Sequence, residues 1–416
     1  MNTPFDLPAS KLPHVGTTIF TEMSALAKAH GALNVSQGFP DFTPPAPLVE
    51  AVAREMRSGS AANQYAPMAG HLALREWIAW DFEHRFNAQY HPESEVTIGA
   101  GASSLIFAAI QAFVGENDEV ILMEPAYDLY APAVELAGGN IRRVERRGED
   151  DGLNFEALRA VLDRRTRMVI VNSPHNPTGA CLRPEDLEML HQILDGSHAL
   201  LLSDEVYGPI VHDSRPVTSV ASHPGLAQRA LIAQSFGKLL HATGWKVGSL
   251  VGPAECMAEV RKVHQYDVFS TAGPTQLGIA SFLRTTDGVA HLAELAAFYE
   301  TKRNRLLQGL RDTAWVFQPA QGGYFQILSY ASILDAPDGA VARSWTQSHD
   351  IGLATIPVSS FYNPRHVMQQ DSRHLRVCFA KGNDTLDQAI EKLRWIAKHP
   401  EHAAAAVMNQ AQTHSK

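Results

Sequence analysis

Residues 199–207 read ALLLSDEVY, an apolar run that ends in acidic and polar side chains. A short apolar run of this kind is typical of a strand that is buried on both faces of a sheet. Two more runs, RMVIVNSP at 167–174 and ALIAQSFGK at 230–238, have the same design. Three buried strands that each end in polar residues indicate a sheet with a candidate functional site at one edge.

Apolar runs and amphipathic stretches alternate on either side of these three strands. Further strands are expected in EVTIGAG (95–101), EVILMEP (119–125) and KVGSLVGP (246–253), and helices in 46–59, 103–115, 154–163 and 184–194. Strands that alternate with helices predict a largely parallel sheet with helices on both faces. The fold class expected is therefore α/β.

A chain of 416 residues is too long for one ordinary core, so two domains are expected. The sequence pattern changes near residue 285, where a long charged amphipathic stretch begins. We expect an N-terminal arm that is also part of the small domain (1–45), a large domain (46–285), a small α+β domain (286–400) and a tail (401–416).

Composition excludes several classes of protein. The net charge is −9, from 35 basic and 44 acidic residues, and the basic stretch RRVERR (142–147) is interrupted by Glu145, which fits a loop or a strand edge. No apolar stretch reaches about 18 residues. The three cysteines have no C-x-x-C spacing, which disfavours disulfides and a thiolate metal site. We expect a cytoplasmic protein that binds no metal, nucleic acid or membrane.

Polar residues follow four of the predicted strands, in the segments 101–103, 172–176, 204–207 and 235–238. In an open α/β sheet, ligands bind at the carboxyl ends of the strands. We therefore expect these four segments to line one cleft.

Lys238 ends a strand and has small or apolar neighbours, Ser235, Phe236 and Gly237. Most lysines are solvated and protonated, and a surface lysine is the ordinary interpretation. Burial or a nearby cation such as Lys246 would lower the pKa of the amine and make it a nucleophile toward carbonyl groups.

Asp204 could be an ordinary cap or turn residue, or a buried carboxylate that pairs with a protonated ring nitrogen. Tyr207 and Asn176 could both reach a phenolic oxygen on the same ring, although HNPTG (175–179) alone is also an ordinary turn.

GASS (101–104) joins a strand to a helix, where free N–H groups favour an anion. Ser103, Ser235 and Lys246 could complete a phosphate site. The pattern is neither a Walker loop nor a G-x-G-x-x-G fingerprint, so nucleotide binding is not indicated.

Together these motifs resemble the class I aminotransferases of the fold-type I pyridoxal-phosphate family, over roughly residues 15–397. The motifs that carry the resemblance, in family order, are SQGFPDF (36–42), NQYAPM (63–68), EPAYDLYAP (124–132), NSPHNPTGA (172–180), SDEVY (203–207), SFGK (235–238), TGWKVG (243–248), RKVHQYDVFS (261–270) and LRVCFAK (375–381). They look most like the bacterial methionine aminotransferases and the related kynurenine and glutamine–phenylpyruvate enzymes.

The resemblance implies a pyridoxal 5'-phosphate cofactor attached to Lys238 as a Schiff base. Asp204 would hold the pyridine nitrogen, Asn176 and Tyr207 the phenolic oxygen, and Tyr127 would stack on the ring. The phosphate would be held by Ala102, Ser103, Ser235 and Lys246. Arg376 would bind the substrate carboxylate by its planar fork, with help from the backbone of Gly38.

The resemblance also implies a homodimer with shared active sites, in which Tyr65 reaches the phosphate of the other subunit. The segment with Tyr266 and Phe269 would line the substrate pocket of the partner, or pack as ordinary interface. One departure is Gly237, where many relatives have serine, so a hydroxyl contact to the phosphate is missing.

The expected activity is ping-pong transfer of an amino group from an uncharged L-amino acid, methionine first and aromatic amino acids or glutamine next, to a 2-oxo acid. The alternatives are a kynurenine or glutamine–phenylpyruvate aminotransferase with carbon–sulfur β-lyase activity on cysteine conjugates, and a regulatory module of the aminotransferase-like kind. A regulator needs a helix-turn-helix region, and none fits before the first motif.

Overall fold

The buried apolar runs form a seven-stranded sheet in the computed structural model, which describes residues 8–147, 151–364 and 372–413. The strands lie in the order β2-β8-β7-β6-β5-β3-β4. Their bounds are β2 (Val96–Gly99), β3 (Glu119–Glu124), β4 (Asn140–Glu145), β5 (Thr166–Asn172), β6 (Leu200–Asp204), β7 (Ala230–Ser235) and β8 (Gly248–Val251). Six strands run in one direction and β8 runs against them, so the prediction of a mostly parallel sheet is confirmed.

The reversal at β8 follows from its short connection to β7. Only residues 236–247 join the two strands, and they hold the short helix α9 (Phe236–Leu239) and the 3₁₀ turn η2 (Thr243–Trp245). A parallel neighbour would need a longer crossover to return to the other edge of the sheet. The chain therefore turns back at the carboxyl edge, and Ile232 pairs antiparallel with Val251.

The central strands are apolar throughout because helices cover both faces of the sheet. In β3, Val120 and Leu122 pack on one face with α4, α5 and α10, whereas Ile121 and Met123 pack on the other with α3, α7 and α11. The bounds of the helices around this sheet are α2 (Ala46–Arg57), α3 (Leu72–Phe86), α4 (Ala102–Phe113), α5 (Tyr130–Leu136), α6 (Phe155–Val161), α7 (Pro184–Leu194), η1 (Val220–Ser222), α8 (Pro224–Ala227), α10 (Ala254–Asp267) and α11 (Gly273–Leu283).

Residues 142–145 of the stretch RRVERR lie in the edge strand β4 and the last two follow it, in line with the strand-edge interpretation of the sequence. Arg142 pairs with Glu119 at 2.9 Å and Arg143 pairs with Glu124 at 2.8 Å, both across the β3–β4 pair. These two arginines are therefore paired with acidic side chains of the neighbouring strand.

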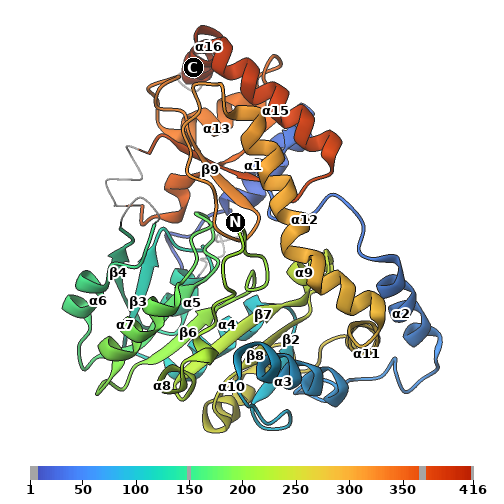
Figure 1. The fold of residues 1–416 in the computed structure, drawn as a ribbon. Coiled ribbons are helices and arrows are strands. Elements are labelled where there is room, and N and C mark those ends of the chain that lie inside the picture. Colours follow the sequence, from blue (N-terminus) through green and yellow to red (C-terminus); the bar gives the residue numbers. More distant parts are fainter. Residues whose placement is uncertain (1–7, 148–150, 365–371, 414–416) are drawn as a thin grey trace, which may run out of the picture.

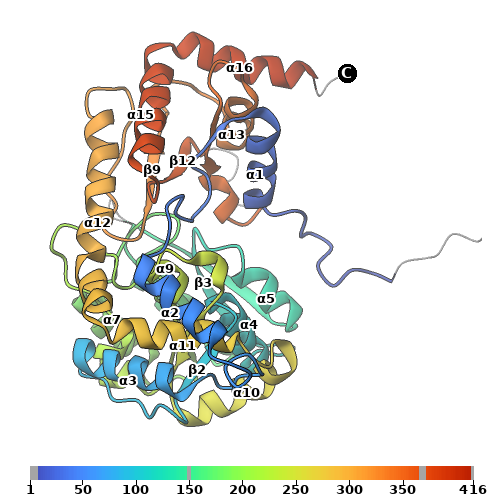
Figure 2. The same ribbon diagram turned by 90° about the vertical axis from the view of Figure 1, so that its right-hand side faces the viewer.

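The second part of the molecule is built from both ends of the chain (Figure 1). It has an antiparallel sheet in the order β11-β12-β9 and a parallel pair, β1 with β10. Its strands are β1 (Leu33–Asn34), β9 (Phe325–Ser329), β10 (Leu353–Ala354), β11 (Ile356–Pro357) and β12 (His374–Cys378); its helices are α1 (Ile19–His30), α12 (Thr286–Leu310), α13 (Asp338–Gln347), η3 (Val358–Phe361), α15 (Asn383–Lys398) and α16 (Pro400–Thr413). The 25-residue helix α12 runs from the large sheet into this upper part, and α1 lies beside the C-terminal elements there (Figure 2).

The C-terminal segment, expected as a tail from residue 401, begins as helix α16. Ala403 is fully buried, and its carbonyl oxygen accepts a hydrogen bond from Nε1 of Trp345 in α13. The start of this segment therefore belongs to the packed structure.

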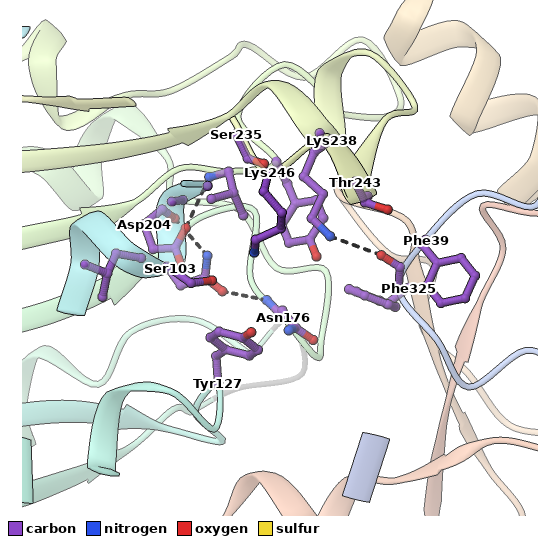
Figure 3. A pocket seen from close by; sticks show the side chains of 18 of the residues that line it. Phe39, Ser103, Tyr127, Asn176, Asp204, Ser235, Lys238, Thr243, Lys246 and Phe325 are labelled. Atoms are coloured by element: carbon purple, nitrogen blue, oxygen red, sulfur yellow. Dashed lines mark hydrogen bonds between the residues drawn. The ribbon is translucent and has the colours of Figure 1, made fainter. Parts of the chain in front are cut away.

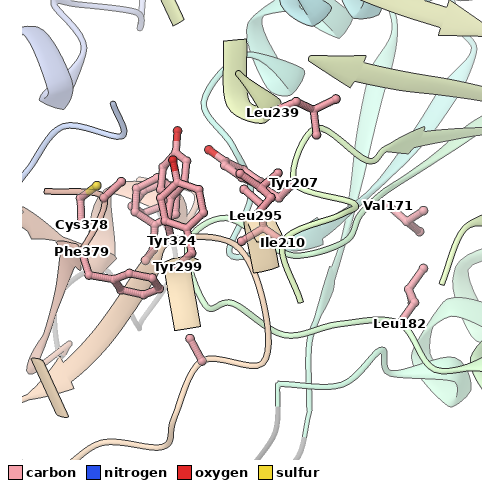
Figure 4. Close-up of a cluster of buried hydrophobic side chains, with 14 of the residues drawn as sticks. Val171, Leu182, Tyr207, Ile210, Leu239, Leu295, Tyr299, Tyr324, Cys378 and Phe379 are labelled. Carbon is pink, nitrogen blue, oxygen red and sulfur yellow. The ribbon is translucent and has the colours of Figure 1, made fainter. Parts of the chain in front are cut away.

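A buried cluster that includes Tyr207, Tyr299 and Tyr324 joins the two parts of the molecule (Figure 4). The rings of Tyr207 and Tyr324 lie 5.0 Å apart, and those of Tyr324 and Tyr299 lie 5.4 Å apart.

No helix of the described residues is long and apolar enough to cross a membrane.

Candidate active site

A pocket of about 330 Å³ opens at the carboxyl edge of the large sheet (Figure 3). Eleven of the thirteen predicted site residues line it: Gly38, Ala102, Ser103, Tyr127, Asn176, Asp204, Tyr207, Ser235, Lys238, Lys246 and Arg376. They come from the last residues of β6 and β7, from the starts of α4 and α9, from β12, and from the loops that follow β1, β3, β5 and β6 or precede β8. The expectation that the polar strand ends meet in one cleft is met.

Lys238 projects into this pocket from the one-turn helix α9. Its Nζ donates a hydrogen bond to the carbonyl oxygen of Gly38 at 3.1 Å. The pKa of this amine is lowered to about 8, chiefly by burial, and the positive charges of Arg376 and Lys246 act in the same direction. The neighbouring cation that the sequence suggested is therefore present, but burial is the larger cause.

Asp204, the last residue of β6, is 4% exposed. Its Oδ2 accepts a hydrogen bond from the hydroxyl of Tyr130 at 2.6 Å, and its Oδ1 accepts one from the N–H of Val206 at 3.2 Å. Burial raises the pKa of the carboxyl, and these two hydrogen bonds and the charge of Lys238 oppose the rise. Asp204 is thus both a turn cap and a buried carboxylate that lines the pocket.

An asparagine at the end of β5 ties two strand ends together. Asn172 donates from Nδ2 to the carbonyl oxygen of Asp204 at 2.8 Å, and its Oδ1 accepts from the N–H of Asn176 at 2.7 Å. Asn176 in turn accepts at Oδ1 from Nη1 of Arg376, also at 2.7 Å. The turn HNPTG is therefore held in a network that runs from β6 to β12.

The N-terminus of α4 faces the ammonium group of Lys246. Gly101 has φ +78°, and a Cβ there would lie 3.1 Å from Nζ of Lys246. Gly248 lets β8 approach, because a Cβ at that position would lie 2.3 Å from the N–H nitrogen of Ala102. Unpaired N–H groups of a helix start beside a lysine make a site for an anion such as a phosphate.

Arg376 is 1% exposed and is surrounded by aromatic rings. Its guanidinium carbon lies 3.9 Å from the ring centre of Phe325 and 5.1 Å from those of Phe20 and Phe361. Nη2 donates to the carbonyl oxygen of Ser36 at 2.8 Å, and Nε has no hydrogen-bond partner within the described residues. Burial lowers its pKa to about 10, so the group stays a cation at neutral pH.

Gly38 is held at the mouth of the pocket by several contacts. Its carbonyl oxygen accepts from the hydroxyl of Tyr324 at 2.6 Å as well as from Lys238. A Cβ at this position would lie 2.6 Å from the ring of Phe325, so only glycine fits. The adjacent Phe39 is 44% exposed and has its carbonyl oxygen bound by Lys381 at 2.9 Å.

Tyr65 and Phe269 do not line this pocket. They lie on the surface, where Tyr65 is 84% and Phe269 is 47% exposed, and their rings are 5.5 Å apart. The same surface stretch includes Tyr266, which is 87% exposed. The structure thus places these three aromatic side chains on the surface, outside the pocket of their own chain.

The family model for class I and II aminotransferases matches residues 31–393. The chain is a class I/II aminotransferase. It is 42% identical to the methionine aminotransferase of Escherichia coli (strain K12), covering 94% of this chain and 98% of that protein, and the crystal structure of that enzyme superimposes with a TM-score of 0.88 over 94% and 99%.

Other relatives are similar over the same length. A probable N-succinyldiaminopimelate aminotransferase of Mycobacterium tuberculosis is 36% identical over 95% of this chain and 100% of that protein. A kynurenine–oxoglutarate transaminase of Dictyostelium discoideum is 31% identical over 94% and 97%. The resemblance seen in the sequence motifs is confirmed at the level of the family.

Several residues of this site were not singled out from the sequence. Asn172, Thr243 and Phe325 line the pocket, whereas Tyr130 and Tyr324 support it through hydrogen bonds to Asp204 and Gly38. Tyr130, Asn172 and Thr243 lie inside motifs that the sequence analysis quoted. A tyrosine or asparagine that acts through a long-range hydrogen bond carries no spacing signal. For Tyr130, Asn172 and Thr243, the signal in the sequence was their position inside a quoted motif.

Gly237, the departure noted in the lysine motif, has a steric reason. A Cβ there would lie 2.9 Å from the Cα atom of Thr243 and 3.3 Å from the carbonyl oxygen of Ala242. The chain returns tightly over this position on its way to β8. Thr243 itself lines the pocket, so a hydroxyl is present close to the place where the motif lacks one.

Proposed function

We propose that this aminotransferase uses pyridoxal 5'-phosphate to move the amino group of an uncharged L-amino acid, methionine foremost, to a 2-oxo acid. The observation that carries the proposal is the meeting of three groups in one pocket: an amine with lowered pKa at Lys238, a buried carboxylate at Asp204 and a buried cation at Arg376.

The pocket fits the cofactor by the chemistry of its donors. The α4 N-terminus with Ala102, Ser103, Ser235 and Lys246 suits a dianionic phosphate. Asp204 suits a protonated ring nitrogen, while Asn176 and Tyr207 offer polar groups for a phenolic oxygen. Tyr127 offers a ring for stacking.

When bound, pyridoxal phosphate supplies an aldehyde carbon for the amine and an electron-poor ring that stabilises negative charge at the substrate Cα. Lys238 would hold the cofactor covalently, and its free Nζ would be the base that takes the proton from Cα. A pKa of about 8 leaves more of this amine neutral near pH 7.5 than a pKa of 10.5 would.

Arg376 would bind the substrate α-carboxylate through Nε, which has no hydrogen-bond partner among the described residues, and the remaining N–H groups of its fork. Gly38 closes the site from the other side through its backbone. The rings of Phe20, Phe39 and Phe325 line the remaining space, and Arg376 is the one arginine among the described lining residues. An apolar or thioether side chain therefore suits this pocket better than a second carboxylate, and the 42% identical E. coli relative is a methionine enzyme.

The test is a panel of amino donors against one 2-oxo acid, with methionine, phenylalanine, glutamine, kynurenine, N-succinyldiaminopimelate and aspartate. Methionine is expected to give the highest kcat/KM, with transfer stoichiometric in keto acid formed. Lys238→Ala is the control and should lose on the order of a thousandfold in rate. A clear preference for aspartate or N-succinyldiaminopimelate would contradict the proposal.

A second candidate is transfer from kynurenine or glutamine, with β-lyase activity on cysteine conjugates. It is favoured by the aromatic lining of the pocket and by the kynurenine relative at 31% identity. The two reactions separate by product, because a lyase releases pyruvate and a thiol without consuming a 2-oxo acid. Release of pyruvate faster than transfer from methionine would favour this candidate.

We further propose a homodimer with shared active sites. Tyr65 and Phe269 are exposed and adjacent, yet absent from the pocket of their own chain, which suits residues that complete the site of a partner. Three free cysteines, Cys181, Cys256 and Cys378, fit a reducing compartment, so we propose the cytoplasm as its location.

A further inference from the structure

The carboxylate of Asp204 has an unusual partner in the first residue of α5. Tyr130 is 3% exposed and donates its hydroxyl hydrogen to Oδ2 at 2.6 Å, across 74 positions of sequence. The N–H of Val206 donates to Oδ1 at 3.2 Å. Each carboxylate oxygen thus accepts one hydrogen bond from the protein, and each keeps a further lone pair.

The groups that face Asp204 from the neighbouring elements differ in charge. Lys238 on α9 is the cation that acts on it, and Tyr127 and Tyr207 are neutral hydroxyl-bearing side chains beside it. Tyr130 is fully buried, and burial together with the charge of Asp204 raises its pKa well above the usual value, so its hydroxyl keeps its proton. Tyr130 can therefore act toward Asp204 only as a neutral donor.

We propose that Tyr130 is a positioning residue for the reaction: its hydroxyl fixes the orientation of the Asp204 carboxylate and stabilises its ionised form, which keeps the ring nitrogen of the bound cofactor protonated. This inference rests on the proposed use of pyridoxal phosphate.

The direction of the effect follows from which protonation state the hydrogen bond favours. A donor to a carboxylate stabilises the anion relative to the neutral acid. Burial disfavours the anion at Asp204, so loss of the Tyr130 donor shifts the shared proton from the ring nitrogen toward the carboxylate. A ring without this proton withdraws electrons less strongly from the substrate Cα.

The test compares holoenzymes of wild type, Tyr130→Phe and Tyr90→Phe, each loaded with cofactor labelled with ¹⁵N in the ring. The Tyr90 hydroxyl is buried, has no hydrogen-bond partner within the described residues and lies outside the pocket, so Tyr90→Phe controls for loss of a buried hydroxyl. In Tyr130→Phe the ring-nitrogen resonance is expected to move toward the unprotonated position. kcat should fall on the order of tenfold, the size of one lost hydrogen bond to a charged group, with KM for methionine little changed.

A second pair of variants keeps the outcome interpretable. With Asp204→Asn there is no anion to stabilise, so Tyr130→Phe should change the ring nitrogen no further in the double variant. An unchanged resonance in Tyr130→Phe, or equal effects with and without Asp204, would overturn the inference. If wild type formed no reducible covalent link between Lys238 and pyridoxal phosphate, the proposed function itself would fail, and mass spectrometry after borohydride treatment detects that result separately.

Discussion

At the scale of the residue, the chemistry of this pocket depends on groups whose burial changes their protonation. Lys238 is the clearest case, since burial lowers its pKa to about 8 from an ordinary value of 10.5. Only the neutral amine attacks the cofactor aldehyde. The fraction of neutral amine rises as pH rises through the pKa, so the gain occurs around pH 8 rather than above pH 10.

We therefore predict that cofactor-free protein attaches pyridoxal phosphate at a rate that increases with pH and levels off above about pH 8. Stopped-flow absorbance of the attached cofactor measures this rate. Lys238→Ala should show no such band at any pH. A rate that kept rising up to pH 10 would mean that the amine titrates like a solvated lysine.

Replacing Arg376 by lysine tests the geometry of its guanidinium group, because the positive charge is kept. We predict that Arg376→Lys raises KM for methionine by about ten- to a hundredfold, because an ammonium group cannot keep the bonds to Asn176 and Ser36 and still meet a carboxylate with a fork. The matched control is Arg305→Lys, which alters an exposed pair with Asp387. Steady-state kinetics measures the KM for methionine of both variants. A KM of Arg376→Lys equal to that of Arg305→Lys would exclude Arg376 as the carboxylate-binding residue.

Sequence reasoning located most of the candidate residues that line this pocket, but not the residues that support them. Lys238, Asp204 and Asn176 could be predicted because each lies within a few residues of the end of an apolar run, and strand ends of a parallel sheet meet at one edge. Tyr130 and Tyr324 could not, because their roles depend on hydrogen bonds to Asp204 and to Gly38, 74 and 286 positions away. No local pattern encodes a contact of that range.

At the scale of the element, the segment from α9 to η2 determines how tightly the lysine is held. The alternation of strands and helices predicted the parallel sheet, but it did not predict that β8 is reversed, since a short apolar run looks the same in both directions. The reversal makes the connection tight, and Gly237 lies under the backbone of Thr243 as a result.

We predict that Gly237→Ser destabilises the protein by about 1–3 kcal/mol, as overpacking against fixed backbone does, and weakens cofactor binding. Gly244→Ser in the same loop is the control, because a Cβ at 244 has no atom within 4 Å. Urea unfolding and cofactor titration of the two variants give the comparison. Equal free energies of unfolding for the two variants would contradict the prediction, and would mean that the backbone near position 237 can move to accommodate the added side chain.

At the scale of the whole molecule, the proposed sharing of active sites can be tested by mixing two inactive variants. In a heterodimer of Lys238→Ala and Tyr65→Ala chains, one site would carry both defects and the other would carry neither. Random exchange makes about half of all dimers mixed, so about a quarter of wild-type activity is expected after mixing. Activity that stayed at the level of the Tyr65→Ala protein alone would show that each site is built from one chain.

The reversed strand β8 has a further consequence for the two lysines of the pocket. Because the chain turns back after β7, Lys238 and Lys246 reach the same edge of the sheet within nine residues of chain, as parts of one local hairpin. A short connection of this kind has a small loop-closure entropy. One local segment therefore carries both amines of the pocket, and a change in its length would displace the two together.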